Sequence, residues 1–253
     1  MKGKVKRRVI AWVLSFALVM GTVLGGPGLF MKAHAADAGV LYIIDSIGGT
    51  PESVTEDCTD SAGGWSYDAG TATLTLDGFQ GEYIEANGDI NIVLKGKNKI
   101  TISAESTEGI KSTGKVTIDD TISPVQDCLD IYCNDGTESV SMIYTGGFGA
   151  DYATYIVGGT VNLVEENTRR RYVTGISRWA YVENDASLNI NLSADGGRNG
   201  AAALLNLNTS GDTSFRVNSL SSSSYGVYSL DKKGSGDTAL TAEGKAKNIG
   251  NKF

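Results

Sequence analysis

Two stretches of the sequence, IEANGDINI at residues 84–92 and IKSTGKVTI at residues 110–118, match position for position. In each, an aliphatic residue is followed by three polar or small residues, a glycine, one polar residue and a short alternating run. Alternation of aliphatic and polar residues with a period of two is typical of half-buried β-strands. Because the same pattern returns along the chain, we expect a structure built from repeated strand units.

Looser copies of this pattern follow the two matching stretches. They begin at Ile131, Ile156, Val182, Leu205 and Val227. The copies recur on average about every 24 residues, a period typical of stacked-repeat proteins. A unit of this length without a helix is too short for a propeller blade and lacks the Leu/Asn pattern of leucine-rich repeats, but it suits one coil of a parallel β-helix.

The predicted fold is therefore all-β, a single-stranded right-handed parallel β-helix (solenoid) of about seven or more coils with a ~24-residue period. The alternative is an antiparallel sandwich, which also has short strands at regular intervals but gives no reason for such a repeat.

The first 35 residues have the features of a secretory signal peptide. Basic residues precede the apolar run Val9–Leu24, and Ala33-His34-Ala35 provides small residues for cleavage after Ala35. The apolar run is a little short for a spanning helix, so a permanent membrane anchor is the alternative. We expect an exported protein with no membrane span after cleavage, either secreted or associated with the cell surface.

Beyond residue 35, we expect two regions. Residues 36–71 are predicted to form an N-terminal cap, with Trp65 covering the first coil, and residues 72–253 to form the β-helix. From Lys232 the chain is rich in Gly and Lys and loses the alternation, so a weakly ordered C-terminal tail is expected.

Charge and histidine content exclude several classes of function. Removing the six basic residues of the first 35 would leave a net charge of about −13 in place of −7, so the protein lacks the basic surface that neutralises nucleic-acid phosphates. The single histidine, His34, leaves with the signal peptide. The mature chain therefore has no Ser-His-Asp or Cys-His machinery and no His-ligated zinc site.

The three cysteines, Cys58, Cys128 and Cys133, leave the pairing open. Cys128 and Cys133 would point to opposite faces of one strand, so a direct disulfide between them needs a turn. Cys58 could pair with either, and buried thiols without a disulfide are the further alternative.

The segments GWSYD (64–68), TLTLDGF (73–79), GDINIVLKG (88–96) and GKVTI (114–118) resemble a known family. They are similar to the secreted carbohydrate-binding β-helix proteins of clostridia and related Gram-positive bacteria, which share a fold with pectate lyases. The resemblance covers residues 64–120. It implies a secreted or surface protein that binds acidic polysaccharide such as pectin, often with calcium, without catalysis. A calcium-dependent polysaccharide lyase and a structural or adhesive surface protein that binds other proteins are the alternatives.

Acidic residues are the candidate calcium ligands, because calcium takes six to eight oxygen ligands and is abundant outside cells. In the predicted repeat, Asp119 and Asp120 occupy the same corner as Glu165 and Glu166, two coils apart. That gap is too wide for one ion unless the coil between them contributes, for instance through Asp127 or Asp130. A solvated acidic face is the alternative explanation.

Aromatic and arginine side chains are the candidate sugar contacts. Trp179 and Tyr181 alternate with Ala180, so they share one face of a strand. If that face is outside, the two rings form a sugar platform, and if it is inside, they belong to the core. The run Arg169, Arg170 and Arg171 could hold a uronate through paired guanidinium hydrogen bonds, or could simply be an exposed loop.

Overall fold

The computed structural model describes residues 40–249, except 47, 105, 121–126, 135, 137–138, 148, 169–171, 184, 195–199, 220–224, 233–235 and 245–246; in some strands only the backbone is described. The chain divides into two units, Met1–His34 and Ala35–Phe253, and every described residue belongs to the second. The predicted signal peptide therefore lies outside the described residues. Among the residues described, no helix is long and apolar enough to cross a membrane.

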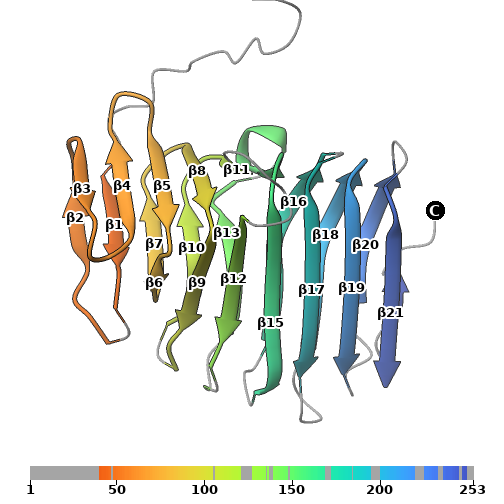
Figure 1. Cartoon of the computed structure of the whole chain (residues 1–253). Helices are drawn as coiled ribbons and strands as arrows, with labels where there is room; N and C mark the ends of the chain where they lie inside the picture. The colour runs from red at the N-terminus through yellow and green to blue at the C-terminus, as the bar shows by residue number, and fades with distance from the viewer. Residues whose placement is uncertain are drawn as a thin grey trace, which may run out of the picture. The chain divides into compact units, whose positions relative to one another are not determined.

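The described part of the chain is all-β, and its one helical element is the short 3-10 helix η1 (Ala150–Tyr152). The strands form two sheets (Figure 1). Sheet B has seven strands: β6 (Gln80–Gly81), β9 (Lys97–Ile102), β12 (Cys128–Cys133), β15 (Thr160–Thr168), β17 (Ser187–Ala194), β19 (Asp212–Ser219) and β21 (Thr238–Gly244).

Sheet A has fifteen strands. They are β1 (Leu41–Ile44), β2 (Glu52–Val54), β3 (Cys58–Asp60), β4 (Trp65–Asp68), β5 (Thr73–Asp77), β7 (Tyr83–Ala86), β8 (Ile90–Lys95), β10 (Glu108–Ser112), β11 (Val116–Asp120), β13 (Val140–Thr145), β14 (Thr154–Ile156), β16 (Tyr172–Val182), β18 (Gly200–Thr209), β20 (Tyr225–Lys232) and β22 (Lys247–Ile249).

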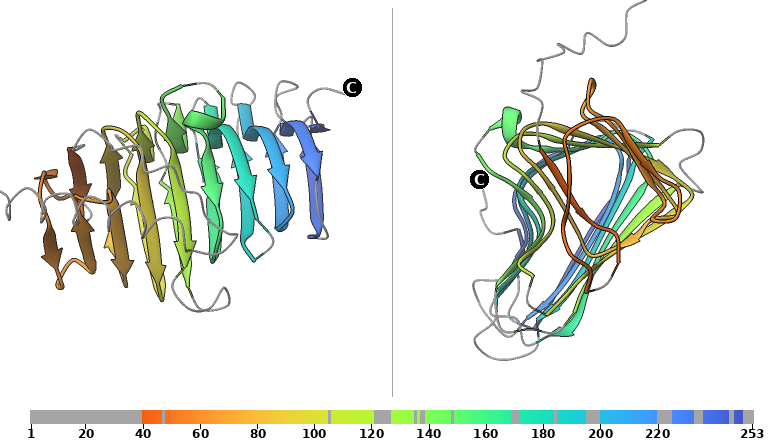
Figure 2. Two further views of the ribbon diagram at one scale, coloured as in Figure 1. Left: turned by 90° about the horizontal axis from the view of Figure 1, so that it is seen from above. Right: turned by 90° about the vertical axis from the view of Figure 1, so that its left-hand side faces the viewer.

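Most neighbouring strands run parallel, and the chain passes repeatedly between the sheets. Sheet A has two arms, β7-β10-β13 and β5-β8-β11-β14. The arms meet at β16, whose first half pairs with β13 and whose second half pairs with β14. Figure 2 shows successive windings side by side, with the two arms and sheet B surrounding a common interior. The structure thus confirms an all-β fold with large parallel sheets.

The two matching stretches of sequence lie next to each other in register. Ile84 of β7 pairs with Ile110 of β10, and Ile92 of β8 pairs with Ile118 of β11. The equivalence extends to side chains, because Lys111 Nζ lies 2.8 Å from Glu85 Oε1 on the neighbouring strand. The two stretches therefore pair strand by strand, and a repeat along the whole chain stays a prediction.

The sequence-based alignment of the looser copies with Ile84 and Ile110 is wrong for Ile131 and Ile156. Ile131 belongs to β12 in sheet B, where it pairs with Ile100, and Ile143 is the residue that follows Ile110 in its column. Ile156 pairs with Ile118. The error has a physical cause: every wall alternates aliphatic and polar residues, so a period-two pattern cannot tell one wall from another when loop lengths vary.

Strand pairing continues beyond Lys232, where the alternation in the sequence is lost, and the expected weak order of the tail stays a prediction. Strand β21 pairs in parallel with β19, and β22 pairs with β20. A glycine- and lysine-rich composition weakens the alternation seen in the sequence, but backbone hydrogen bonds do not depend on side-chain type.

The core consists of aliphatic side chains stacked in columns. Ile92, Ile118 and Ile156 occupy equivalent positions on β8, β11 and β14, and all three are 0% exposed. Parallel strands lie about 4.8 Å apart, so each isoleucine packs directly on the next. Burying an aliphatic side chain of this size contributes about 1.5–3 kcal/mol, and this repeated burial is the main stabilising contribution.

Antiparallel strands precede the parallel stack. β1 pairs antiparallel with β2 and β7, and β3-β4-β5 form an antiparallel meander. Trp65 on β4 is 2% exposed, and its Nε1 donates to Asp45 Oδ2 at 3.4 Å. The preceding Gly64 has φ +73°, and a Cβ there would lie 2.7 Å from the carbonyl oxygen of Asp77. Glycine is therefore required at this turn.

One buried amide connects three windings. Asn98 on β9 is 1% exposed, and its Oδ1 accepts a hydrogen bond of 2.9 Å from the N–H of Phe79. Its Nδ2 lies 3.3 Å from the carbonyl oxygen of Cys128 on the next strand of sheet B. Asn98 thus satisfies backbone groups that would otherwise be buried without a partner.

We expect Asn98→Ala to lower the free energy of unfolding by about 1–3 kcal/mol, because it leaves buried backbone groups unpaired. The matched control is Asn91→Ala, since half-buried Asn91 makes one side-chain bond, to the carbonyl oxygen of Thr71 at 3.1 Å. Its loss should cost about 0.5–1.5 kcal/mol or less. Urea unfolding measures both variants, and equal losses would contradict the role assigned to Asn98.

Candidate functional site

Trp179 and Tyr181 lie on the outer face of β16. Their neighbours Ala180 and Val182 are 0% and 2% exposed, whereas Trp179 and Tyr181 are half-buried. Because side chains alternate along a strand, the two rings point away from the core. Of the two alternatives left open by the sequence, the structure supports the outside placement.

A third ring joins them from the neighbouring strand. Tyr155 on β14 pairs in register with Tyr181, and the two ring centroids are 4.5 Å apart with an interplanar angle of 5°. Rings this close and parallel overlap face to face. Trp179 lies beside Tyr181, at a centroid distance of 6.4 Å and an angle of 18°. We call Tyr155, Trp179 and Tyr181 the aromatic cluster.

The aromatic cluster continues a line of outward positions across sheet A. Starting from Tyr181, successive partners in register are Tyr155, Thr117 of β11, Asn91 of β8 and Thr73 of β5. These four steps between strands span about 19 Å. We call these five residues the outer row. It has the half-buried Thr73 and Asn91 at one end, the buried Thr117 (7% exposed) in the middle and aromatic rings at the other end.

Groups of both charges surround the aromatic cluster. Lys115 Nζ lies 5.7 Å from the centroid of Tyr155, within range of a cation–π contact. Burial raises the pKa of the Tyr155 hydroxyl, and Tyr181, Asp151 and Glu183 raise it further. The negative charges of Asp151 and Glu183, which are both exposed, therefore offset the positive charge of Lys115 near the Tyr155 ring.

Arg169, Arg170 and Arg171 lie outside the described residues, between β15 and β16. Their expected contact with a uronate stays a prediction.

Three of the six expected calcium ligands lie near one another at the end of β11 and before β12. Asp119 is exposed, Asp120 is half-buried, and Asp127 is 7% exposed just before β12. Asp127 Oδ1 accepts a hydrogen bond of 2.6 Å from the N–H of Gly96, and Asp119 Oδ1 accepts one of 2.8 Å from the N–H of Asp120. We call these three residues the acidic corner.

Asp120 is the strained member of the acidic corner. Its Oδ2 is buried and has no hydrogen-bond partner among the described residues. Burial raises the pKa of the Asp120 carboxyl, and the negative charges of Asp119 and Asp127 add to the increase. The ionised carboxylate is thus destabilised in the folded protein.

The other three expected ligands lie elsewhere, which corrects the predicted arrangement. Glu165 on β15 is 0% exposed and belongs to sheet B, where it pairs with Cys133. Asp130 faces outward from β12, and its Oδ1 accepts a hydrogen bond of 2.7 Å from Asn162 Nδ2. Glu166 follows in β15, and its side chain lies outside the described residues. The shared corner of Asp119, Asp120, Glu165 and Glu166 was wrong because Ile156 aligns with Ile118, not with Ile110.

Among the described residues, no group of three or more acidic, cysteine or histidine side chains is arranged to hold a metal ion. A calcium ion at the acidic corner would therefore need oxygen ligands from a bound glycan, from solvent or from the undescribed residues 121–126. Calcium stays a prediction.

The cysteines form no disulfide. Cys58 and Cys128 are half-buried and Cys133 is buried, and none of the three is in a disulfide. Burial, followed by the charge of Asp130, raises the pKa of the Cys128 thiol, which makes it a weak nucleophile at neutral pH.

Sequence reasoning missed the roles of Tyr155 and Lys115. A signal for Tyr155 was available, since it directly precedes Ile156 just as Tyr181 directly precedes Val182 in two segments that pair in register. Lys115 carried no such signal, because its contact with Tyr155 depends on the packing of β11 beside β14.

A scan against models of protein families and searches of curated proteins and of solved structures find no match to this chain. The resemblance at residues 64–120 thus stays a prediction.

We expect Asp120→Asn to stabilise the protein at neutral pH by up to about 1 kcal/mol, or roughly 2–4 °C in melting temperature. Because the folded-state pKa of Asp120 is raised, its destabilising effect exists above that pKa and disappears as the pH falls through it. The gain should therefore vanish in acid. Thermal melts across pH measure this, with the exposed Asp77→Asn as control.

A lower melting temperature for Asp120→Asn at neutral pH would contradict the repulsion assigned to the acidic corner.

Added calcium distinguishes a metal site at the acidic corner from a solvated acidic face. A metal site predicts a calcium-dependent rise in melting temperature that Asp120→Asn abolishes, whereas a solvated acidic face predicts no such rise.

Proposed function

We propose that the chain is an exported, non-catalytic polysaccharide-binding protein, and that its fold is a right-handed parallel β-helix. The repeated passage of the chain between parallel sheets supports the fold, because each winding places new strands beside the equivalent strands of the last. The apolar, small-residue pattern of residues 1–35 supports export.

The observation that carries the binding function is the aromatic cluster at the end of the outer row. Three half-buried rings on the outer surface provide an apolar platform. Tyrosine and tryptophan have an apolar ring with a polar tip, so they are favoured where a ligand is apolar on one face and hydrated on the other. The hydroxyl of Thr73 and the amide of Asn91, both half-buried, continue the row with donors and acceptors, whereas Thr117 between Asn91 and Tyr155 is buried. A linear sugar polymer presents both apolar ring faces and hydroxyl edges.

The orientation of the stack limits which rings a sugar can cover. Tyr155 and Tyr181 each cover one face of the other, so their outer faces and edges remain. Trp179 pairs in register with Asn206 of β18, not with an aromatic residue. We therefore infer that Trp179 provides the main sugar-stacking face and that Tyr181 extends it.

The charges around the aromatic cluster suit a neutral polysaccharide better than an acidic one. Near Tyr155, one lysine, Lys115, stands against two carboxylates, Asp151 and Glu183, so these groups have no excess of positive charge for uronates. Binding of pectin, as the resemblance implies, would depend on Arg169–Arg171 or on calcium at the acidic corner. A lyase would also need a basic residue beside that calcium, and formation of an unsaturated product would detect it by ultraviolet absorbance.

Affinity electrophoresis tests the function. The purified protein is run through gels that contain xylan, a soluble cellulose derivative or polygalacturonate, each with calcium or with EDTA. We expect retardation by at least one neutral polysaccharide regardless of calcium. If only polygalacturonate retards the protein, and only with calcium, the protein binds an acidic polysaccharide through calcium. That result would contradict the preference for neutral polysaccharides that we infer from the charges. No retardation in any gel would contradict glycan binding and favour a structural or adhesive role.

We expect Trp179→Ala and Tyr181→Ala each to weaken binding at least about fivefold, since loss of one ring contact is worth about 1 kcal/mol. The matched control is Tyr132→Ala, because Tyr132 is 37% exposed on sheet B, away from the outer row. Its affinity should equal that of the wild type. If Tyr132→Ala were the variant that loses binding, the site would lie on sheet B.

A further inference from the structure

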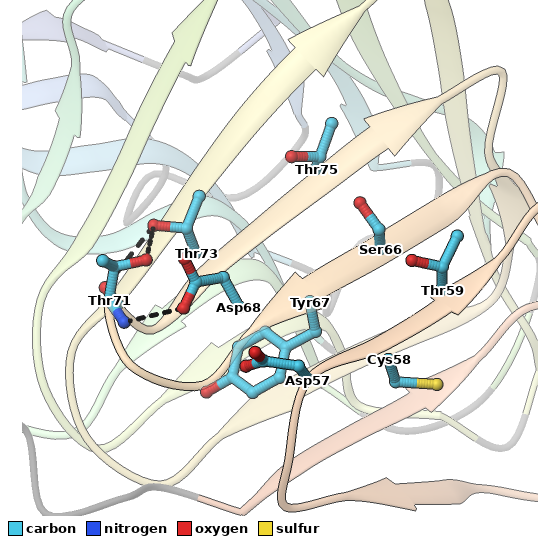
Figure 3. A pocket seen from close by; sticks show the side chains of 9 residues that line it. All are labelled: Asp57, Cys58, Thr59, Ser66, Tyr67, Asp68, Thr71, Thr73 and Thr75. Carbon is cyan, nitrogen blue, oxygen red and sulfur yellow. Dashed lines mark hydrogen bonds between the residues drawn. The ribbon is translucent and has the colours of Figure 1, made fainter.

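An open pocket of about 430 Å³ lies on sheet A, on strands β3, β4 and β5 (Figure 3). It is separate from the aromatic cluster, but the outer row leads from one to the other, because Thr73 lines the pocket and begins that row. A binding site here would therefore lie on the same surface as the proposed polysaccharide platform.

Three free hydroxyls cross this pocket in a line. Thr59 on β3 pairs in register with Ser66 on β4, and Ser66 pairs with Thr75 on β5. Side chains directly opposite each other on antiparallel strands have Cβ atoms about 4.5–5.5 Å apart. Within the described part of the chain, none of these three hydroxyls has a hydrogen-bond partner. Each can donate one bond and accept two, which suits a ligand with hydroxyls on adjacent carbons.

Two carboxylates flank the hydroxyl line. Asp57 Oδ1 accepts a hydrogen bond of 3.0 Å from the N–H of Ala69, and Asp68 Oδ1 accepts one of 3.1 Å from the N–H of Thr71. These bonds hold both carboxylates in place and leave one oxygen of each without a partner among the described residues. No lysine or arginine lines the pocket.

The pocket therefore has a definite charge preference. Asp57 directly precedes β3 and Asp68 ends β4, and both line the pocket without a lysine or arginine to balance them, so a positively charged ligand group is attracted there. A uronate would add a third negative charge and is disfavoured. The hydroxyl line selects for a polyhydroxylated ring, and the carboxylates select for a ring that carries a cation.

We propose that this pocket binds an aminohexose unit with a free, protonated amine, with Thr59, Ser66 and Thr75 contacting its hydroxyls and Asp57 and Asp68 contacting its amine. The proposal rests on the proposed function, since the outer row would carry the rest of the same glycan towards the aromatic cluster. It adds a preference that the aromatic cluster alone would not have.

The test compares three soluble oligosaccharides of equal length by isothermal titration calorimetry: a glucosamine oligomer, its N-acetylated form and a galacturonate oligomer. The purified protein should bind the glucosamine oligomer roughly tenfold more tightly than the acetylated one, because a charge-assisted hydrogen bond is lost on acetylation. The galacturonate oligomer should bind most weakly in the absence of calcium.

Variants assign the preference to the pocket. Asp57→Asn and Asp68→Asn should reduce the ratio between the free-amine and acetylated oligomers towards one. Asp77→Asn controls for general attraction to an acidic protein, because Asp77 is exposed at the end of the same β5 and lies outside the pocket lining. Ser66→Ala should weaken binding of both oligomers, and Ser141→Ala, half-buried on β13, should not.

Equal affinity for the free-amine and acetylated oligomers would overturn the proposal, as would a ratio that Asp77→Asn reduces as much as Asp68→Asn. The proposed function fails separately. Tyr181→Ala should weaken binding of every glycan and leave the ratio unchanged, so a protein that binds glycans with a ratio of one refutes only the pocket preference. A protein that binds no glycan refutes both.

Discussion

The in-register stacking of parallel strands is the constraint on which the rest of this structure depends. Each strand donates and accepts backbone hydrogen bonds with the winding before and after it, so equivalent residues lie about 4.8 Å apart. Ile92, Ile118 and Ile156 show the inner consequence, a column of fully buried aliphatic side chains. A slip of one residue would place this column in solvent, so the core and the register enforce each other.

The same stacking arranges the outer surface. Residues that are distant in sequence become neighbours in the outer row, where Tyr155 and Tyr181 stack because their strands pair in register. At its other end the row reaches an antiparallel meander, and there the outward positions are hydroxyls and carboxylates instead of rings. One surface thus combines an apolar platform with a polar pocket, and the spacing of the strands sets the distance between them.

The net charge of the chain does not show where its acidic residues lie or what they contact. The net charge of −7 is spread over separate environments: Glu85 pairs with Lys111, Asp130 accepts from Asn162, and Asp120 stays in a repulsive corner. Only Asp119, Asp120 and Asp127 of the six expected ligands come together. The alignment of coils failed for Glu165 because loops of unequal length shift the register from one winding to the next, and alternation in sequence carries no record of those shifts.

The sequence by itself determined the all-β class, the half-buried strands and the pairing of residues 84–92 with 110–118, because alternation reports which side chains are buried. It left Trp179 and Tyr181 undecided between core and surface, because Ala180 and Val182, which alternate with them, are also apolar, so the alternation here does not show which face is buried. Only the tertiary structure decided that they face outward, that Tyr155 joins them and that the hydroxyls of Thr59, Ser66 and Thr75 form one line. Those arrangements arise from pairing between strands, and strand pairing is a property of the folded chain.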